Sequence, residues 1–205
     1  MQARKLAVDG AVEFSPEVFA DDRGHFVSPY QEAAFVEAVG RPLFAVAQTN
    51  ISVSRRSVVR GVHFTATPPG TAKYVYCTSG KVLDIVVDIR VGSPTFGRWD
   101  AVVLDPRSCR ASYLPLGVGH AFVALEDDSV MSYLVSQTYV PHQELGLSVL
   151  DPELGLPIPP DIDPLLSERD LTAPTLAEAR ASGLLPDYAT CLRIEADPPV
   201  HARPA

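Results

Sequence analysis

Cysteine is scarce in this sequence, and the few cysteines form no recognisable pattern. There are three, Cys77, Cys109 and Cys191, an odd number at wide spacing with no Cys-x-x-Cys pair. This argues against a disulfide scaffold and favours reduced thiols, so we expect a cytoplasmic protein. The N-terminus lacks the apolar core of a signal peptide, and no apolar run is long enough to cross a bilayer, so no membrane partner is expected.

Basic residues are also few. The formal net charge is −8, from 17 lysines and arginines against 25 aspartates and glutamates. A protein that binds the phosphate backbone of nucleic acid normally carries a basic face, so no nucleic-acid partner is expected. A small anionic ligand is compatible with the local cluster of four cations, Arg55, Arg56, Arg60 and Lys73.

Several catalytic motifs are missing. The sequence has no Gly-rich nucleotide loop of either common pattern and no Gly-x-Ser-x-Gly elbow, so phosphoryl transfer, dinucleotide binding and serine hydrolysis lack their usual parts. Its five histidines include no His-x-His pair, and only His63 and His120 lie in strand-like core context. Two isolated histidines make a weak metal site, so we expect no metal and no other cofactor.

Short strand patterns separated by turns are abundant. The chain has 19 prolines and 13 glycines in 205 residues, which favours many turns. About seven short strands with little helix between them predict an all-β fold, an antiparallel sandwich or barrel, and a jelly roll fits best because its interior can hold a ligand. We expect one domain over residues 1–185, short peripheral helices over residues 31–39 and 174–181, and a C-terminal tail over residues 186–205.

The most informative stretch covers residues 58–64 and contains Arg60, Gly61 and His63, with Lys73 following. A regular strand would send Arg60 and His63 to opposite faces. A bulge or bend at Gly61 would re-aim the histidine, so that both polar groups face one pocket. The alternative is a surface arginine and a satisfied core histidine.

Further polar side chains recur on strand faces that a jelly roll can turn inward, namely Lys73, His120 and Tyr133. A preceding strand carries an amide- and hydroxyl-bearing face at Gln48, Asn50 and Ser52, which matters if that face points into a cavity. A histidine base, a tyrosine acid, a lysine and a bound anion are the parts needed to remove a proton next to a carbonyl and to return it elsewhere. The lysine and a second imidazole would stabilise the enolate oxygen.

Several motifs resemble, in order and spacing, the dTDP-4-dehydrorhamnose 3,5-epimerase family over about residues 8–185. They are residues 60–64, Lys73, and residues 84–90, 92–97, 117–122 and 166–170. The resemblance implies a cupin-type jelly-roll homodimer, an isomerase that works without a metal on a dTDP-4-keto-6-deoxyhexose.

The resemblance also implies roles for individual residues. His63 would be the base that takes the proton alpha to the C4 ketone, with Asp170 holding its tautomer. Tyr133 would return a proton to the opposite face, and Lys73, with His120 nearby, would stabilise the enolate. The substrate contacts that it implies are Arg60, Arg23 and Arg169 for the diphosphate, Gln48 and Asn50 for sugar or phosphate, and Phe26, Tyr139 and Glu144 for the thymidine.

A few positions depart from the family pattern. Thr65 and Thr71 stand where glutamine is common, and Ser28 replaces an acid. These departures resemble the antibiotic deoxysugar branch of the family, so we expect inversion at C5, with or without C3. Alternatives are a C3-only epimerase or a ketoisomerase on the same fold, or a jelly roll that binds a nucleotide sugar without turning it over. The joint presence of a base, a lysine and an acid counts against the last.

Overall fold

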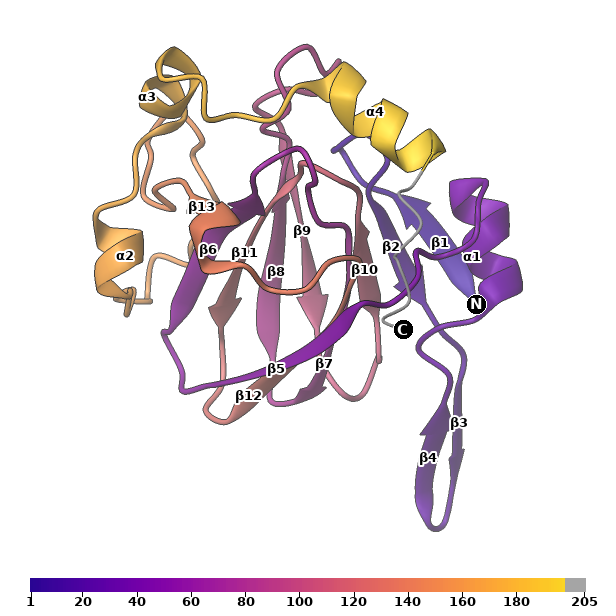
Figure 1. The fold of residues 1–205 in the computed structure, drawn as a ribbon. Coiled ribbons are helices and arrows are strands. Elements are labelled where there is room, and N and C mark those ends of the chain that lie inside the picture. Colours follow the sequence, from indigo (N-terminus) through magenta and orange to yellow (C-terminus); the bar gives the residue numbers. More distant parts are fainter. Residues whose placement is uncertain (198–205) are drawn as a thin grey trace.

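The computed structural model describes residues 1–197 and shows two antiparallel sheets packed face to face (Figure 1). One sheet has six strands in the order β1-β2-β10-β7-β12-β5, and the other has five in the order β13-β6-β11-β8-β9. Strands that are distant in sequence alternate across both sheets, as in a jelly roll. The expected all-β jelly-roll fold is confirmed.

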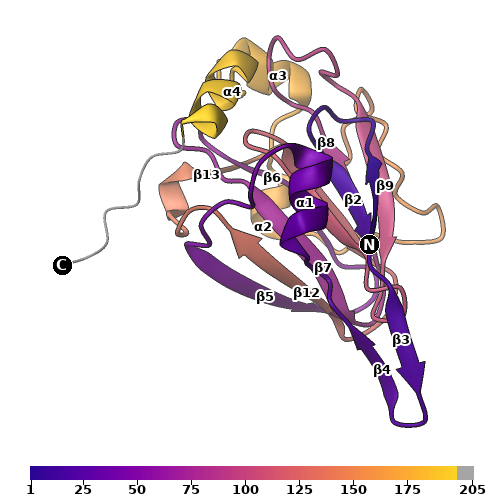
Figure 2. The same cartoon turned by 90° about the vertical axis from the view of Figure 1, so that its right-hand side faces the viewer.

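The strands are short and belong to three sets. The six-stranded sheet contains β1 (Gln2–Lys5), β2 (Val12–Ser15), β10 (Ala111–Leu114), β7 (Lys73–Ser79), β12 (Ser129–Val135) and β5 (Gln48–Ser54). The five-stranded sheet contains β13 (Glu144–Gly146), β6 (Val59–Thr65), β11 (Gly119–Ala124), β8 (Val82–Val87) and β9 (Trp99–Leu104). A separate hairpin of β3 (Val18–Asp21) and β4 (Gly24–Val27) projects away from the sandwich, as Figure 2 shows.

The helices are short and peripheral. They are α1 (Glu32–Val39), the 3-10 turn η1 (Pro141–Gln143), α2 (Glu168–Leu171), α3 (Leu176–Ala181) and α4 (Tyr188–Ala196). Helix α1 ends at Gly40, which adopts a left-handed φ of 84°. Helix α3 begins at Thr175, whose side chain forms a capping box with Glu178. Both helices were expected from the sequence, within two residues of these bounds.

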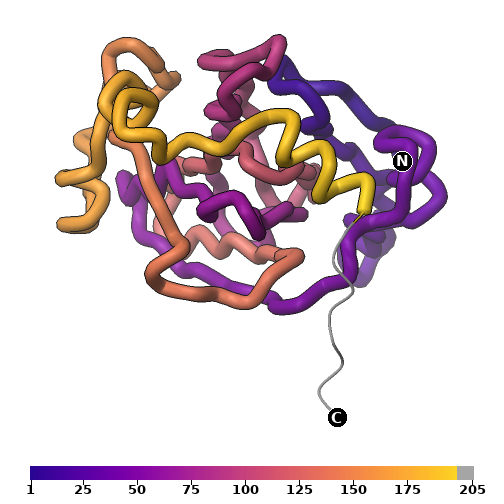
Figure 3. Tube along the Cα trace, turned by 45° about the horizontal axis from the view of Figure 1, so that its top comes forward, coloured from indigo at the N-terminus to yellow at the C-terminus, as the bar shows by residue number. Residues whose placement is uncertain are grey.

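Both sheets pack against other elements on part of their outer faces as well as against each other, while the outer face of the edge strand β5 stays exposed. Between the sheets, Val75 of β7 packs with Val86 of β8 and Met131 of β12. The outer face of the five-stranded sheet, which includes Ile85, lies under the segment that follows β13 and under α3. The outer face of the six-stranded sheet packs against α1 and α4, and Figure 3 shows the chain passing over one end of the sandwich from α3 to α4.

Helix α4 lies in the segment that we expected to be a C-terminal tail, residues 186–205. Its Cys191 is 1% exposed. A carboxylate oxygen of Glu195 accepts a hydrogen bond from the Leu116 N–H at 2.9 Å and pairs with Arg41 at 2.9 Å. Residues 188–196 therefore pack on the sandwich, and residues 198–205 lie outside the described residues.

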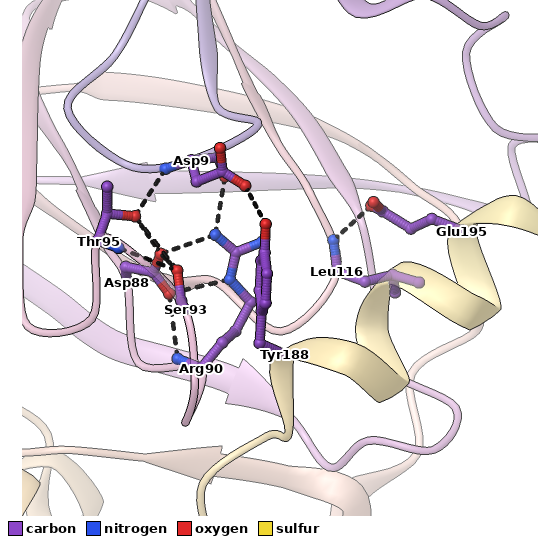
Figure 4. A network of polar contacts seen from close by, with 8 residues as sticks. All are labelled: Asp9, Asp88, Arg90, Ser93, Thr95, Leu116, Tyr188 and Glu195. Atoms are coloured by element: carbon purple, nitrogen blue, oxygen red, sulfur yellow. Dashed lines mark hydrogen bonds and ion pairs between the residues drawn. The ribbon is translucent and has the colours of Figure 1, made fainter.

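A buried ion pair joins the loop after β8 to both ends of the chain (Figure 4). Arg90 Nη2 donates to Asp88 Oδ2 at 2.8 Å and to the Asp9 carbonyl at 2.7 Å. The Tyr188 hydroxyl donates to the Asp9 carboxylate at 2.5 Å, and the Arg90 guanidinium lies 5.0 Å from the centre of the Tyr188 ring. Ser93 also donates to Asp88, at 2.6 Å. Asp88, Arg90 and Ser93, which belong to the motifs over residues 84–97, therefore have a structural role.

Two further findings bear on the sequence expectations. None of the helices within residues 1–197 is both long and apolar enough to span a bilayer. Cys77, Cys109 and Cys191 are free thiols.

Candidate active site

A pocket of about 210 Å³ opens between the two sheets, and both sheets contribute to its walls. Eight of the residues selected from the sequence line it: Asn50, Arg60, His63, Lys73, His120, Tyr133, Tyr139 and Glu144. The polar face predicted for residues 48–52 therefore points into a cavity. Strands β6 and β11 supply one wall, and strands β5, β7 and β12 supply the wall opposite.

Strand β6 brings Arg60 and His63 to the same side because its alternation changes in the middle. Val59 and Val62 both belong to the cluster on the outer face of the sheet, although an odd number of positions separates them. Arg60 and His63 both line the pocket. The pairing of β6 with β11 shifts register at this point. The irregularity predicted around Gly61 is thus confirmed.

Gly61 permits this shift because the neighbouring strand comes very close. Its φ is +119°, and a Cβ at this position would come within 2.6 Å of Ala121 Cα and still nearer to the carbonyl oxygen of His120. A side chain here would therefore meet backbone rather than a movable group. The absence of a side chain at residue 61 sets the direction of His63.

His63 is held by a carboxylate on the first turn of α2. Its Nε2 lies 2.6 Å from Asp170 Oδ1. Ser167 caps the helix: its hydroxyl donates to Asp170 Oδ2 at 2.9 Å and accepts from the Asp170 N–H at 3.2 Å. Burial acts to raise the pKa of the Asp170 carboxyl, but the hydrogen bond and charge of His63 outweigh it and the pKa is lowered. When the ring is neutral, a carboxylate in this position accepts the Nε2 proton, and the lone pair is then on Nδ1.

A second histidine–carboxylate pair lies deeper in the pocket. His120 stands opposite His63 in the strand register, and its Nε2 lies 2.6 Å from Asp84 Oδ1. Burial lowers the pKa of His120, which outweighs the opposing effect of Asp84. Asp84 was not selected from the sequence as a site residue; it lies on the face of β8 opposite Leu83 and Ile85. The face with Leu83 and Ile85 packs outward, and Asp84 points between the sheets.

Lys73 and Tyr133 complete the set of ionisable groups. Burial lowers the pKa of the Lys73 ammonium, an effect that Glu144 and Asp84 partly oppose. Burial raises the pKa of the Tyr133 phenol to about 12. The tyrosine therefore keeps its proton at neutral pH and has one to give.

Polar contacts brace the mouth of the pocket. Arg60 Nε donates to the Ser54 hydroxyl at 3.2 Å, which anchors the cation to β5. Gln48 donates to Asn50 at 2.6 Å and accepts from the Tyr139 N–H at 2.9 Å. Gln48 thereby supports two lining residues. These contacts hold the Asn50 amide and the Arg60 guanidinium in the wall of the pocket.

Three of the substrate-contact residues selected from the sequence lie elsewhere in the described chain. Arg23 and Phe26 are on the projecting hairpin, where the Arg23 side chain is 90% exposed and Phe26 is 68% exposed. Arg23 pairs with its neighbour Asp21 at 2.6 Å. Arg169 is exposed on α2, next to Asp170. One chain on its own does not bring these three side chains to the pocket.

Several lining residues were not selected as site residues from the sequence: Ile51, Ser52, Thr65, Thr71, Phe122, Val135, Gln137 and Thr138. Period-two spacing identifies two of them, because Phe122 follows His120 and Val135 follows Tyr133 on the same strand faces. The Thr65 hydroxyl donates to the Glu144 carboxylate at 3.0 Å. Gln137 and Thr138 lie in the irregular segment after β12, where no strand periodicity assigns a direction.

Comparisons with known proteins agree with this arrangement. A family model described as dTDP-4-dehydrorhamnose 3,5-epimerase matches residues 5–178. The chain is 52% identical over 199 residues to a dTDP-4-dehydrorhamnose 3-epimerase of Streptomyces niveus, covering 97% of this chain and 95% of the relative. It is 52% identical over 189 residues to a dTDP-4-dehydrorhamnose 3,5-epimerase of Streptomyces griseus, covering 92% of this chain and 94% of the relative.

A solved structure is equally similar. It is that of NovW, a 4-keto-6-deoxy sugar epimerase from the novobiocin biosynthetic gene cluster of Streptomyces spheroides. It superposes with a TM-score of 0.89 at 53% identity and covers 93% of this chain and 95% of that chain.

Proposed function

The chain belongs to the dTDP-4-dehydrorhamnose 3,5-epimerase family, and we propose that its pocket inverts a carbon next to the C4 ketone of a dTDP-4-keto-6-deoxyhexose through an enolate. The chain is an isomerase of the dTDP-sugar epimerase class. The observation that carries the proposal is the placement of His63 and Tyr133 on opposing sheets across one pocket. Inversion needs a base on one face of the sugar ring and an acid on the other.

His63 is the proposed base. Its Nδ1 takes the alpha proton, and Asp170, held at 2.6 Å from Nε2, stabilises the imidazolium that forms. The carboxylate also fixes the tautomer, since a proton on Nε2 is the one that it can accept.

Lys73 is the proposed donor to the enolate oxygen. A preorganised charged donor acts strongly where water is excluded, and each such group is worth roughly 3 kcal/mol. His120 shares this end of the pocket, but its Nε2 faces Asp84 and burial lowers its pKa. In the neutral form its other nitrogen accepts rather than donates, so the charge on the enolate is assigned to Lys73.

Tyr133 is the proposed acid. Its pKa of about 12 keeps the phenol protonated at neutral pH. The base, the oxyanion donor and the acid are all side chains of this protein.

The nucleotide is proposed to lie along the rim, with the diphosphate at Arg60 and the sugar or phosphate oxygens at Gln48 and Asn50. Tyr139 and Glu144 are proposed to contact the thymidine. The support is that Asn50, Arg60, Tyr139 and Glu144 line the pocket that holds the acid and the base, and that Gln48 donates a hydrogen bond to Asn50.

A homodimer would explain the projecting hairpin. Phe26 and Phe19 on it are 68% and 55% exposed, and Ile51 on the outer face of the edge strand β5 is 72% exposed. Exposed apolar side chains on a projecting hairpin and on an edge strand are of the kind that a protein–protein interface covers. We propose that the hairpin carries Arg23 and Phe26 to the pocket of a second copy.

Arg169 is proposed to assist at the diphosphate from its own chain. The three free thiols support a cytoplasmic location.

Mixing two inactive variants tests the dimer. His63→Ala destroys the base, and Arg23→Ala removes the cation that would be supplied to the partner. Co-refolding them yields mixed dimers in which one pocket has both groups, so activity should return. Continued inactivity of a mixture shown to contain mixed dimers would contradict the shared site.

The reacting carbon is a finer question. The sequence predicts inversion at C5, with or without C3, and the relatives above are by name a 3-epimerase and a 3,5-epimerase. We propose that C5 and C3 both react. Proton NMR of dTDP-4-keto-6-deoxyglucose in heavy water follows the two protons separately.

Exchange at both carbons is the expected result. Exchange at C3 alone would contradict the assignment at C5. Exchange at neither carbon, with dTDP still bound, would identify a binding protein instead. His63→Ala is the matched control, and it should abolish exchange while dTDP binding is nearly unchanged.

A further inference from the structure

The hydroxyl of Tyr133 contacts a residue with no role in the proposed chemistry. Ser52 Oγ lies 3.3 Å from the Tyr133 hydroxyl. The two residues are on adjacent antiparallel strands, where Ser52 pairs with Met131 and Tyr133 pairs with Asn50. They are diagonal neighbours on the face that points into the pocket, a relation that brings long side chains into reach.

Within residues 1–197 this contact is the only hydrogen bond that the Tyr133 hydroxyl makes. The other polar groups that face the phenol come from four strands and act at longer range: Asp84, Arg60, Cys77 and the ring of His120, whose centre lies 6.0 Å away. Ser52 likewise has the Tyr133 hydroxyl as its hydrogen-bond partner in the described part of the chain. Two residues further along β5, Ser54 has a different function, since it accepts from Arg60.

We propose that Ser52 is a positioning residue for Tyr133, and that its hydroxyl donates to the phenol oxygen so that the phenol proton faces the pocket. A phenol has one proton, and it can be given to carbon only if it is not already donated to a neighbour. With Ser52 as donor, the Tyr133 proton is free. This inference rests on the proposed epimerase function.

The same hydrogen bond supports the charge that appears during the reaction. When the enolate carbon forms its new C–H bond, the Tyr133 O–H bond breaks and its electron pair remains on the phenolate oxygen. The phenolate then regains a proton from solvent and the His63 imidazolium releases its proton to solvent, so that both groups return to their starting states. A hydrogen bond to an ionised group is stronger than one to a neutral group, so Ser52 stabilises the phenolate more than the phenol. In the resting protein Ser52 acts in the same sense, since it opposes the burial that raises the pKa of Tyr133.

The test separates proton removal from inversion. Ser52→Ala should leave exchange of the alpha proton within about twofold of the wild type, and it should slow inversion roughly tenfold or more, as expected for the loss of a hydrogen bond to a charged group. Ser52→Thr keeps a hydroxyl and should restore inversion. Ser52→Cys, similar in size but a weak donor, should resemble Ser52→Ala.

A double-mutant cycle identifies the residue through which Ser52 acts. In a Tyr133→Phe background the phenol oxygen is gone, so adding Ser52→Ala should cause no further loss. Ser112→Ala is the matched control, because it removes a buried hydroxyl from the same sheet, away from the pocket lining. It should change neither rate.

Three results would overturn the inference: unchanged inversion in Ser52→Ala, equal loss of exchange and inversion, or a further loss in the Tyr133→Phe background. The last two would mean that Ser52 contacts the substrate. If Ser52→Ala does not fold, the Ser52→Thr and Ser52→Cys pair gives the same comparison. If the proposed epimerase function itself is wrong, the wild type will show no exchange of the alpha proton, which none of these three results involves.

Discussion

Replacing Asp170 with Asn is the sharpest test of the base. The substitution keeps the size of the side chain and changes the atoms that face His63. At present Asp170 Oδ1 lies 2.6 Å from His63 Nε2, and Asp170 itself is 5% exposed. An asparagine amide can donate to Nε2, which would move the ring proton to Nδ1. The nitrogen proposed to take the alpha proton would then already carry one.

The expected loss has two parts. A hydrogen bond to a charged partner is worth about 1.5–3 kcal/mol, which corresponds to roughly 10- to 100-fold in rate. The wrong tautomer adds to this, and the loss of a carboxylate partner from a histidine base costs about 10⁴-fold in the serine protease triad. We therefore expect Asp170→Asn to lower the rate of alpha-proton exchange by at least about 100-fold.

Deuterium exchange followed by proton NMR measures this rate directly, and a dTDP titration shows whether the pocket is intact. Ser167→Ala is the matched control, since it removes one hydrogen bond from the carboxylate and keeps its charge. Its loss should stay within about tenfold. An exchange rate for Asp170→Asn within about fivefold of the wild type would refute the assignment of the His63–Asp170 pair as the base.

The pH dependence of stability offers a second readout of the same variant. The pKa of Asp170 is lowered from its ordinary value of 3.8. A carboxyl with a depressed folded-state pKa contributes stability that is fully present above the unfolded value and is lost as the pH falls through the folded value. The difference in melting temperature between the wild type and Asp170→Asn should therefore shrink as the pH falls below 3.8.

A pH profile and two substitutions test other parts of the structure. Lys73 must be charged to stabilise the enolate, and burial lowers its pKa from 10.5. Activity should therefore fall as the pH rises, before the pH reaches 10.5. A fall in activity only above pH 10.5 would contradict the role. Gly61→Ala should destabilise the protein by roughly 1–3 kcal/mol, because the φ of +119° and the approach of Ala121 exclude a Cβ. An unchanged free energy of unfolding in chemical denaturation would be inconsistent with this geometry. Tyr188→Phe should cost about 1 kcal/mol of stability by removing the hydrogen bond to Asp9, while the catalytic rate is unchanged. A loss of activity without a loss of stability would mean that α4 influences the pocket.

Local chemistry made much of this site predictable. The glycine between Arg60 and His63 predicted the irregularity in β6, because no other residue tolerates such an approach of backbone. Period two places Lys73 on the same face of β7 as Val75; Val75 belongs to the cluster between the sheets, and Lys73 lines the pocket. The pairing of Asp170 with His63 came from the family resemblance alone. The two residues are 107 positions apart, and no local pattern encodes that contact.

Other features were beyond local reasoning. Apolar periodicity in β8 indicates a buried face, but both faces of β8 are buried, so it could not show that Asp84 points inward. The hairpin with Arg23 and Phe26 reads as an ordinary turn, and its projection from the sandwich follows from packing rather than from sequence. Helix α4 was missed although most of its residues are apolar; it buries little, since Cys191 is its one buried residue and Leu192 is 44% exposed.

The bond between Tyr188 and Asp9 has a consequence for how the protein is made. It joins residues 179 positions apart. During translation the Asp88–Arg90 pair emerges long before the helix that covers it, and the Arg90 guanidinium is then held without the Tyr188 ring. A nascent chain therefore completes this region only after its C-terminal helix leaves the ribosome, and contacts of such long range form slowly. A chain truncated before residue 188 would lack both the Tyr188 hydrogen bond to Asp9 and the ring that lies beside Arg90.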